Sequence, residues 1–210
     1  MRRLPIYILI DTSGSMRGEP IEAVRVGLQN MLSSLKRDPY ALETVFLSII
    51  TFDREAKVLF PLTDIDQVVL PKIPPLTSTP TNLGEALELL CQRYKMEVQK
   101  TTKSKKGDWL PMAVIMTDGT PSDIMLFNQM CQEIKRYQFV HIIGCAAGPK
   151  AKKESLNKFC TTVSSLETMD SNSFAQFWNW ISQIFTRHSQ SSNSKLDKLP
   201  PLPPEIKLAI

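Results

Sequence analysis

The sequence contains little histidine and little glycine, and it has no long apolar run. Only 2 of its 210 residues are histidine and 8 are glycine. No apolar segment approaches the ~20 residues that a membrane-spanning helix needs. There is no glycine-rich phosphate loop and no nucleophile elbow. His141 and His188 follow no triad pattern and lie at no metal-ligand spacing to a cysteine. These absences argue against a membrane helix, a P-loop enzyme, a serine hydrolase and a zinc site.

The sequence also lacks a strong excess of either charge. Lys and Arg number 25 against 21 Asp and Glu, which gives a net charge of +4. That excess is too small to indicate a nucleic-acid ligand. The opening "MRRLPIYILID" weakly resembles a secretory signal, but Asp11 interrupts the apolar stretch and no small-residue cleavage site follows. We interpret it as the first strand of the fold.

The four cysteines form no C-x-x-C pair and lie in apolar surroundings. Such a pattern is typical of buried free thiols in a reducing cytosol, although a disulfide between two of them is an alternative.

Apolar segments of strand length recur along the chain. Most are apolar nearly throughout, as expected for strands that are covered on both faces. The predicted strands are residues 4–10, 44–52, 112–116, 140–145 and 163–169. Residues 56–64 resemble a short extra strand that returns antiparallel at the edge of the sheet.

Segments with helical periodicity separate these strands. The predicted helices are residues 19–38, 82–98, 122–138 and 174–185. The alternation predicts an α/β fold of the Rossmann-like, doubly wound type. Its sheet would be mostly parallel, with one antiparallel edge strand and helices on both faces. Ligands of such sheets bind at the carboxyl ends of the strands, where the strand order reverses.

Two segments fall outside this pattern. Residues 100–108, "KTTKSKKGD", form a basic loop, which is either a solvated connection or a docking patch for an acidic partner. We expect one domain over residues 1–190, followed by a proline-rich C-terminal tail over residues 191–210. Its final "EIKLAI" alternates apolar and polar residues as a short strand does. The tail could be loose, fold back onto the domain or add to a partner.

The first predicted strand ends in Asp11, Ser13 and Ser15 at alternate positions. Asp and Ser are common in turns and at helix N-caps, so these residues alone are weak evidence. Thr81, however, precedes a helix that it or Asn82 could cap, and Asp118 follows another buried strand. Because all three segments end at strand ends or helix starts, we expect their oxygen atoms to converge.

Hydroxyl and carboxylate oxygens are the ligands of a hard divalent cation such as Mg²⁺, which takes about six oxygens and readily keeps waters. Two carboxylates, Asp11 and Asp118, leave such an ion short of negative charge. The pattern therefore predicts an ion with a coordination position open to the Asp or Glu of another protein.

These five residues, Asp11, Ser13, Ser15, Thr81 and Asp118, resemble the metal-ion-dependent adhesion site of von Willebrand factor A domains. The resemblance in order, spacing and strand context spans about residues 4 to 188. It implies direct ligation by the three hydroxyls, with the carboxylates acting directly or through water. It also implies bound Mg²⁺, or alternatively Mn²⁺ or Ca²⁺. Family members often have glycine before the threonine, whereas Pro80 stands here and stiffens the loop.

The sequence looks most like the TerY-like bacterial branch, which is associated with tellurium resistance. That resemblance implies a cytoplasmic adaptor or scaffold in a stress-response system, with a protein kinase and a PP2C-like phosphatase as partners. We expect a protein that is monomeric in isolation and has no enzymatic activity. The residues expected to contact the partner around the metal are Gly14, Met16, Pro80, Asn82 and Gly119.

A Mg²⁺-dependent phosphohydrolase is the alternative function. Phosphatases of the haloacid dehalogenase type need a second Asp two residues after the first, and here that residue is Ser13. The pattern therefore favours a binding module.

Overall fold

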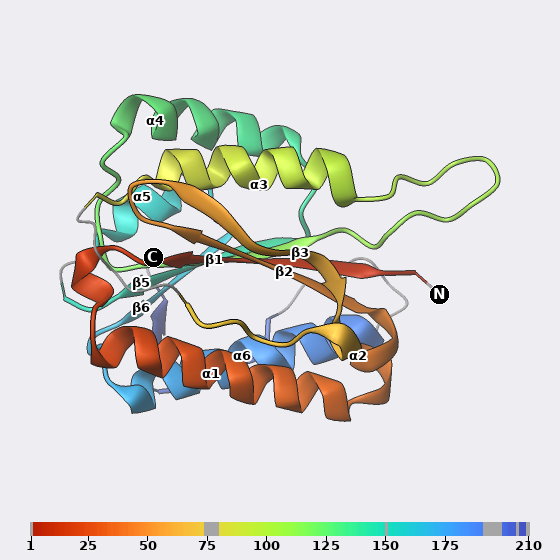
Figure 1. Ribbon diagram of the computed structural model, residues 1–210, viewed down its shortest axis with the longest axis horizontal. Helices are drawn as coiled ribbons and strands as arrows, with labels where there is room; N and C mark the ends of the chain where they lie inside the picture. Colours follow the sequence, from red (N-terminus) through yellow and green to blue (C-terminus); the bar gives the residue numbers. More distant parts are fainter. Residues whose placement is uncertain (1, 74–79, 150, 191–198, 205, 209–210) are drawn as a thin grey trace.

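The computed structural model describes residues 2–73, 80–149, 151–190, 199–204 and 206–208, and it places a seven-stranded sheet between two layers of helices (Figure 1). The strands are β1 (Leu4–Asp11), β2 (Val45–Phe52), β3 (Ala56–Asp64), β4 (Met112–Thr117), β5 (His141–Ala147), β6 (Thr162–Leu166) and β7 (Ile206–Leu208). The α-helices are α1 (Glu19–Arg37), α2 (Pro39–Thr44), α3 (Leu83–Glu97), α4 (Ile124–Glu133), α5 (Lys153–Asn157) and α6 (Ser171–Gln190).

The strand order is β3-β2-β1-β4-β5-β6-β7, and the five inner strands run parallel. β1 pairs with β2 on one side and with β4 on the other, so the strand order reverses between β1 and β4. The predicted α/β architecture is confirmed, with one correction. Two antiparallel strands close the sheet instead of one, because β7 pairs with β6 at the edge opposite β3.

All eight residues of β1 are buried, which explains their nearly unbroken apolar character. Successive side chains of a strand point to opposite faces of the sheet. Ile6 and Ile8 belong to the core cluster with α1 and α6, whereas Tyr7 and Leu9 belong to the cluster with α3 and α4. The central strand is therefore packed by helices on both sides (Figure 1).

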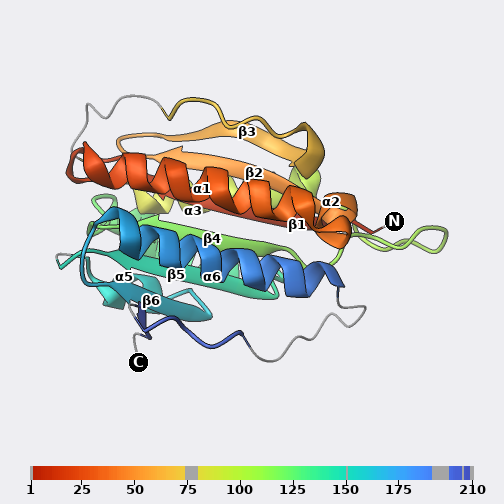
Figure 2. The same ribbon diagram turned by 90° about the horizontal axis from the view of Figure 1, so that it is seen from below.

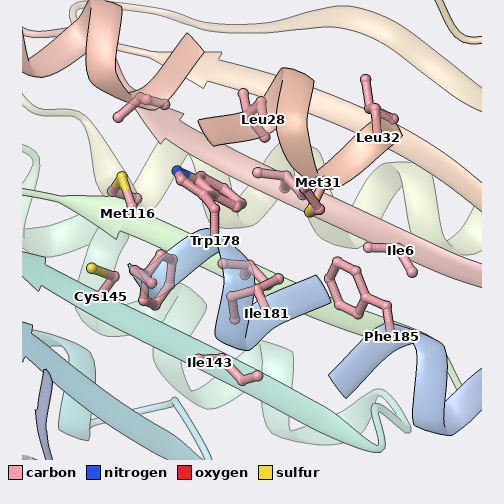
Figure 3. Close-up of a cluster of buried hydrophobic side chains, with 14 of the residues drawn as sticks. Ile6, Leu28, Met31, Leu32, Met116, Ile143, Cys145, Trp178, Ile181 and Phe185 are labelled. Carbon is pink, nitrogen blue, oxygen red and sulfur yellow. The ribbon is translucent and has the colours of Figure 1, made fainter. Parts of the chain in front are cut away.

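Helices α1 and α6 lie side by side across one face of the sheet (Figure 2). A Cβ atom built on Gly27 of α1 would lie 2.1 Å from Cδ1 of Trp178, so glycine lets the two helices approach this closely. Figure 3 shows Trp178 packed between Leu28 and Met116, which joins both helices to the sheet. Among the described residues, none of the helices is both long enough and apolar enough to cross a lipid bilayer.

Two short helices, α2 and α5, were not predicted. Pro39 opens α2, and the Asp38 carboxylate accepts the N–H of Ala41 at 2.8 Å. The helix is only six residues long, which is too short to show an apolar periodicity.

The described part of the C-terminal segment packs against the domain. The indole N–H of Trp180 donates to the Pro200 carbonyl at 3.0 Å, and Leu199 and Leu202 contact the core. Ile206 in β7 is buried. Of the three arrangements that the sequence left open, these residues adopt the folded-back one. Residues 191–198 lie outside the described residues.

The four cysteines are free thiols, three of them buried and Cys160 half-buried. Burial raises the pKa of Cys91 to about 12 and that of Cys131 to about 11. These thiols are protonated at neutral pH, so they behave as small apolar side chains.

A buried histidine makes the stability of this fold depend on pH. The ring of His188 in α6 lies 5.6 Å from that of His141, and its Nε2 atom has no hydrogen-bond partner among the described residues. Burial, with a smaller contribution from His141, lowers the pKa of His188 to about 4. The unfolded chain binds this proton near pH 6.5, so between about pH 6.5 and 4 it holds more protons than the folded chain. The free energy of unfolding therefore falls as the pH falls through this range.

We expect this loss to be about 1–2 kcal/mol after allowance for solvent screening. Urea unfolding of the wild type and of a His188→Gln variant at pH 7.5, 6.0 and 4.5 measures it. The variant should lose less stability between pH 6.5 and 4 than the wild type does. Equal losses in the two proteins would contradict the assignment.

Candidate metal centre at the carboxyl edge of the sheet

Three segments that are distant in the sequence meet at the carboxyl ends of β1 and β4. Asp11 ends β1, and Asp118 directly follows β4. Thr81 lies in the loop before α3, and its hydroxyl oxygen is close enough to Gly119 that a Cβ atom there would lie 2.8 Å from it. The structure thus brings the predicted site residues together at the point where the strand order reverses.

Asp11 is fully buried and is held by hydrogen bonds to both of its carboxylate oxygens. Oδ1 accepts the N–H of Ser13 at 2.8 Å, and Oδ2 accepts the hydroxyl of Thr117 at 2.5 Å. Burial raises the pKa of Asp11 to about 6, and the nearby Asp118 carboxylate adds to this effect. No ion pair to Asp11 exists among the described residues, so these residues leave its charge without a cationic partner.

The two serines connect Asp11 to Asp118. A short 3-10 helix, η1 (Gly14–Met16), turns the chain after β1 so that the hydroxyls of Ser13 and Ser15 lie 3.3 Å apart. The Ser15 hydroxyl donates to Oδ1 of Asp118 at 2.9 Å. Ser15 is exposed, whereas Ser13 and Asp118 are buried. The oxygen cluster therefore opens to solvent on the side of Ser15.

Two hydrogen bonds to Ser122 hold the backbone of Thr81 in place. Its N–H donates to the Ser122 hydroxyl at 3.0 Å, and its carbonyl accepts the Ser122 N–H at 2.9 Å. This pair of bonds ties the loop before α3 to the loop after β4. Gly119 lies between them and leaves the space that the Thr81 hydroxyl occupies.

The cap of α3 comes from a residue that the sequence analysis did not identify. Asp123 accepts the N–H groups of Gly84 at 3.1 Å and Glu85 at 2.8 Å. Neither Thr81 nor Asn82 caps this helix with its side chain, which corrects the prediction. The Asn82 amide instead donates to the Arg54 carbonyl at 2.7 Å. Because Asp123 precedes α4, it fixes the starts of α3 and α4 next to each other.

Four of the five expected partner-contact residues, Gly14, Pro80, Asn82 and Gly119, are half-buried around the oxygen cluster. Met16 is different, because it is fully buried in the core beneath η1. Its apolar side chain packs inward, so the prediction that Met16 contacts a partner is wrong.

Sequence reasoning missed three residues that position the site: Thr117, Ser122 and Asp123. Each holds a ligand candidate or its loop through one or two hydrogen bonds. The stretch "TDGTPSD" placed all three beside Asp118, and a Ser or Asp just before a helical pattern is a capping signal. What the sequence did not show is that the Asp123 carboxylate caps a different helix.

The donor set fits a hard divalent cation. Two carboxylates and three hydroxyls meet at one edge, and Gly119 leaves room for one of those hydroxyls. The described residues contain no group of three or more His, Cys, Asp or Glu side chains able to hold a metal. Any ion here therefore depends on hydroxyl oxygens, which Mg²⁺, Mn²⁺ and Ca²⁺ accept more readily than softer metals do.

The family model of the von Willebrand factor type A domain matches residues 6–186. The chain belongs to this family. Members of the family commonly mediate metal-dependent protein–protein interaction and are generally not enzymes. The matched range contains all five oxygen-bearing residues of the site.

Solved structures with the same fold come from distant proteins. The VWA domain is 15% identical to proximal thread matrix protein 1 of the mussel byssus, a structure described as having a zinc-occupied MIDAS motif, with a TM-score of 0.62 over 90% of this chain and 46% of that one. It is 12% identical to the pilus adhesin SpaC of Lactobacillus rhamnosus GG, with a TM-score of 0.68 over 90% and 30% of the two chains. The PilB minor pilin of Streptococcus sanguinis, as a D319A mutant, is 10% identical, with a TM-score of 0.68 over 92% and 64%.

The chain spans less than two thirds of the length of each of these proteins. At such low identity the likeness shows the fold alone. A search of curated proteins found no match.

Proposed function

We propose that this VWA domain is a metal-dependent adaptor that binds an Asp or Glu side chain of a partner protein. The observation that carries the proposal is the connected oxygen cluster, in which the buried Asp11 and Asp118 are linked through Ser13 and Ser15. Two carboxylates at one edge repel each other unless a cation lies between them. The common role of the family supports the same conclusion.

Each residue has a distinct role in this proposal. Ser13, Ser15, Thr81 and Asp118 would ligate the ion. Asp11 would act from behind, because both of its oxygens already accept hydrogen bonds from Ser13 and Thr117. A bound divalent cation supplies a positive centre that attracts an anionic oxygen. The exposure of Ser15 marks the side from which a partner carboxylate approaches.

Two apolar side chains give this face a second means of contact. Ile124 and Met125, in the first turn of α4, are 60% and 89% exposed and directly follow the Ser122–Asp123 pair that fixes the site. A partner that places a carboxylate at the metal can bury apolar surface against this turn. We therefore propose a partner segment in which an apolar residue lies near the acidic one.

We propose Mg²⁺ as the resident ion, with Mn²⁺ or Ca²⁺ as alternatives, because hydroxyl and carboxylate oxygens suit hard cations. The zinc in the mussel protein shows only that a related motif can hold a divalent metal. Pro80 stiffens the loop that carries Thr81, so we propose that this hydroxyl keeps its place when a partner binds.

The resemblance to the TerY-like branch supports a more specific proposal. We propose a cytoplasmic protein of a bacterial tellurite or stress response, monomeric in isolation, with a protein kinase and a PP2C-like phosphatase among its partners. We also propose that it has no catalytic activity. A phosphohydrolase would need an acid two residues after Asp11, and at that position Ser13 instead donates its N–H to Asp11.

The test is capture of partners from lysate in Mg²⁺ and in EDTA, with wild type and a Ser15→Ala variant in parallel. At least one protein should be retained only by the wild type and only in Mg²⁺. Its retention should be lost after the lysate carboxyl groups have been amidated with a carbodiimide and an excess of glycinamide. An identical set of retained proteins in Mg²⁺ and EDTA would overturn the proposal.

A further inference from the structure

A cavity of about 740 Å³ lies at the end of the sheet where β1 and β4 begin, opposite the oxygen cluster. Its lining residues come from the end of α3, the loop that leads into β4, the start of the chain and the residues after α4. Figure 1 shows these segments at one end of the molecule. β1 runs from this edge to Asp11, so the eight residues of the strand separate the two sites by about 25 Å. The volume lies within the range of small-molecule sites, about 300–1,000 Å³.

Four of the five charged side chains that line the cavity are positive. Arg2, Lys95, Lys100 and Arg136 line it, whereas its one carboxylate is Asp108. Both Asp108 oxygens accept hydrogen bonds from Arg3, at 2.9 and 2.7 Å, so its charge is already balanced. The cavity therefore has a net positive potential.

Arg2 is held in place without being neutralised. Its Nε atom donates to the Gly107 carbonyl at 2.8 Å, and Nη2 donates to the Asp108 carbonyl at 2.9 Å. Neither acceptor is charged, and Arg2 forms no ion pair with any residue that the structure describes. A guanidinium fixed in this way is a preorganised anion-binding group.

The helix ends account for only part of this charge. Lys95 in the last turn of α3 and Arg136 after α4 complement the negative ends of helix dipoles, and Arg136 also pairs with Glu133 at 2.8 Å. Arg2 and Lys100 lie on neither helix, so no such explanation applies to them. The positive charges of Arg2 and Lys100 in the cavity therefore need another explanation, such as a bound anion.

Aromatic side chains line the same cavity. Tyr94 and Tyr137 meet edge to face with ring centroids 5.0 Å apart, and Lys95 lies 5.6 Å from the Tyr137 ring centroid. Trp109 is half-buried. Part of its side chain packs against the core, and the part that lines the cavity can contact a ligand. Fixed cations beside an aromatic face suit a ligand that joins phosphate to a planar ring.

We propose that this cavity binds a small phosphorylated ligand of the nucleotide class. Phosphate oxygens would meet Arg2 and the neighbouring lysines, and the base would stack on Trp109. This site is independent of the proposed metal centre, and it makes no use of the oxygen cluster.

The test is titration of the protein with ADP, AMP, adenosine and inorganic phosphate, in EDTA so that the metal centre cannot contribute. No tag is placed next to Arg2 in this experiment, because this residue lines the cavity. Trp178 and Trp180 are buried, so quenching of fluorescence should report Trp109. We expect ADP to bind at least 10-fold more tightly than adenosine or inorganic phosphate, and Trp109→Phe to lose the quenching.

Arg2→Ala and Lys95→Ala should each weaken ADP binding measured by calorimetry, the first by at least 10-fold. Lys95→Ala provides an independent check, because Arg2 also holds the loop at Gly107. Lys57→Ala is the matched control, since this exposed lysine lies on β3 outside the cavity lining. No binding of ADP or AMP at millimolar concentration would overturn the proposal. So would equal binding of ADP and adenosine, or of ADP and inorganic phosphate.

Discussion

Replacing Asp11 with asparagine should abolish the stabilisation of this protein by Mg²⁺ while leaving the fold intact. For the wild type, ion at 100 times its Kd adds about 2.7 kcal/mol to the free energy of unfolding. For a domain of this size that gain corresponds to a rise in Tm of about 5–10 °C. Asparagine removes the charge behind the hydroxyls, so we expect metal affinity to fall at least about 100-fold and the shift to disappear.

The same variant should not be less stable than the wild type in EDTA. Burial raises the pKa of Asp11 to about 6, which means that the fold disfavours its charged form at neutral pH. The asparagine oxygen can accept the Ser13 N–H, and its amide can donate to the Thr117 hydroxyl. A structural role for Asp11 predicts the opposite result, a loss of stability in EDTA.

Thermal unfolding with and without Mg²⁺, and calorimetry of metal uptake, measure both effects. Asp66→Asn is the matched control, because Asp66 is exposed in the 3-10 helix η2 (Ile65–Gln67), which follows β3. It should keep the full Mg²⁺ shift. A shift of wild-type size in Asp11→Asn would contradict the assignment of the metal centre.

The sequence was informative where one physical signal dominated. Uninterrupted apolar runs predicted the parallel strands, because a strand covered on both faces has no polar side to reveal. β3 was predicted over the residues where it lies, 56–64, because a stretch of strand length follows β2 directly and can return antiparallel beside it. The alternation in "EIKLAI" predicted a short strand where β7 lies, but β7 is only three residues long and pairs with a strand 40 residues earlier, so nothing local showed that it would join this sheet.

The arrangement of the site depends on contacts between distant residues, which could not be predicted from sequence spacing. Asp11, Ser13 and Ser15 lie in one turn, and their proximity follows from the chain. The hydrogen bonds from Thr117 to Asp11 and from Thr81 to Ser122 join residues 106 and 41 positions apart. For Met16, by contrast, the position in the sequence led to a wrong prediction. Its position beside Ser15 suggested the surface, but successive side chains of a 3-10 helix lie about 120° apart, and here the methionine points into the core.

Replacing Gly119 with alanine should remove metal binding by displacing one hydroxyl. The new Cβ atom would lie 2.8 Å from Oγ1 of Thr81, closer than two such atoms tolerate. Thr81 can relieve the contact by rotating about χ1, because its backbone is held separately by Ser122. Thr81 is buried, so we expect stability in EDTA to fall by no more than about 1.5 kcal/mol, the upper end of the cost of a strained side-chain torsion.

Rotation moves the Thr81 hydroxyl out of its position beside Gly119, so metal affinity should fall by about 10- to 100-fold, as when a group that orients a metal ligand is lost. Calorimetric titration with Mg²⁺ and with Mn²⁺ measures the change. Thr120→Ala, at the exposed neighbouring position, is the control and should bind as the wild type does. If Gly119→Ala retained wild-type affinity, Thr81 would not be a ligand, and the ion would be held by the β1 and β4 segments alone.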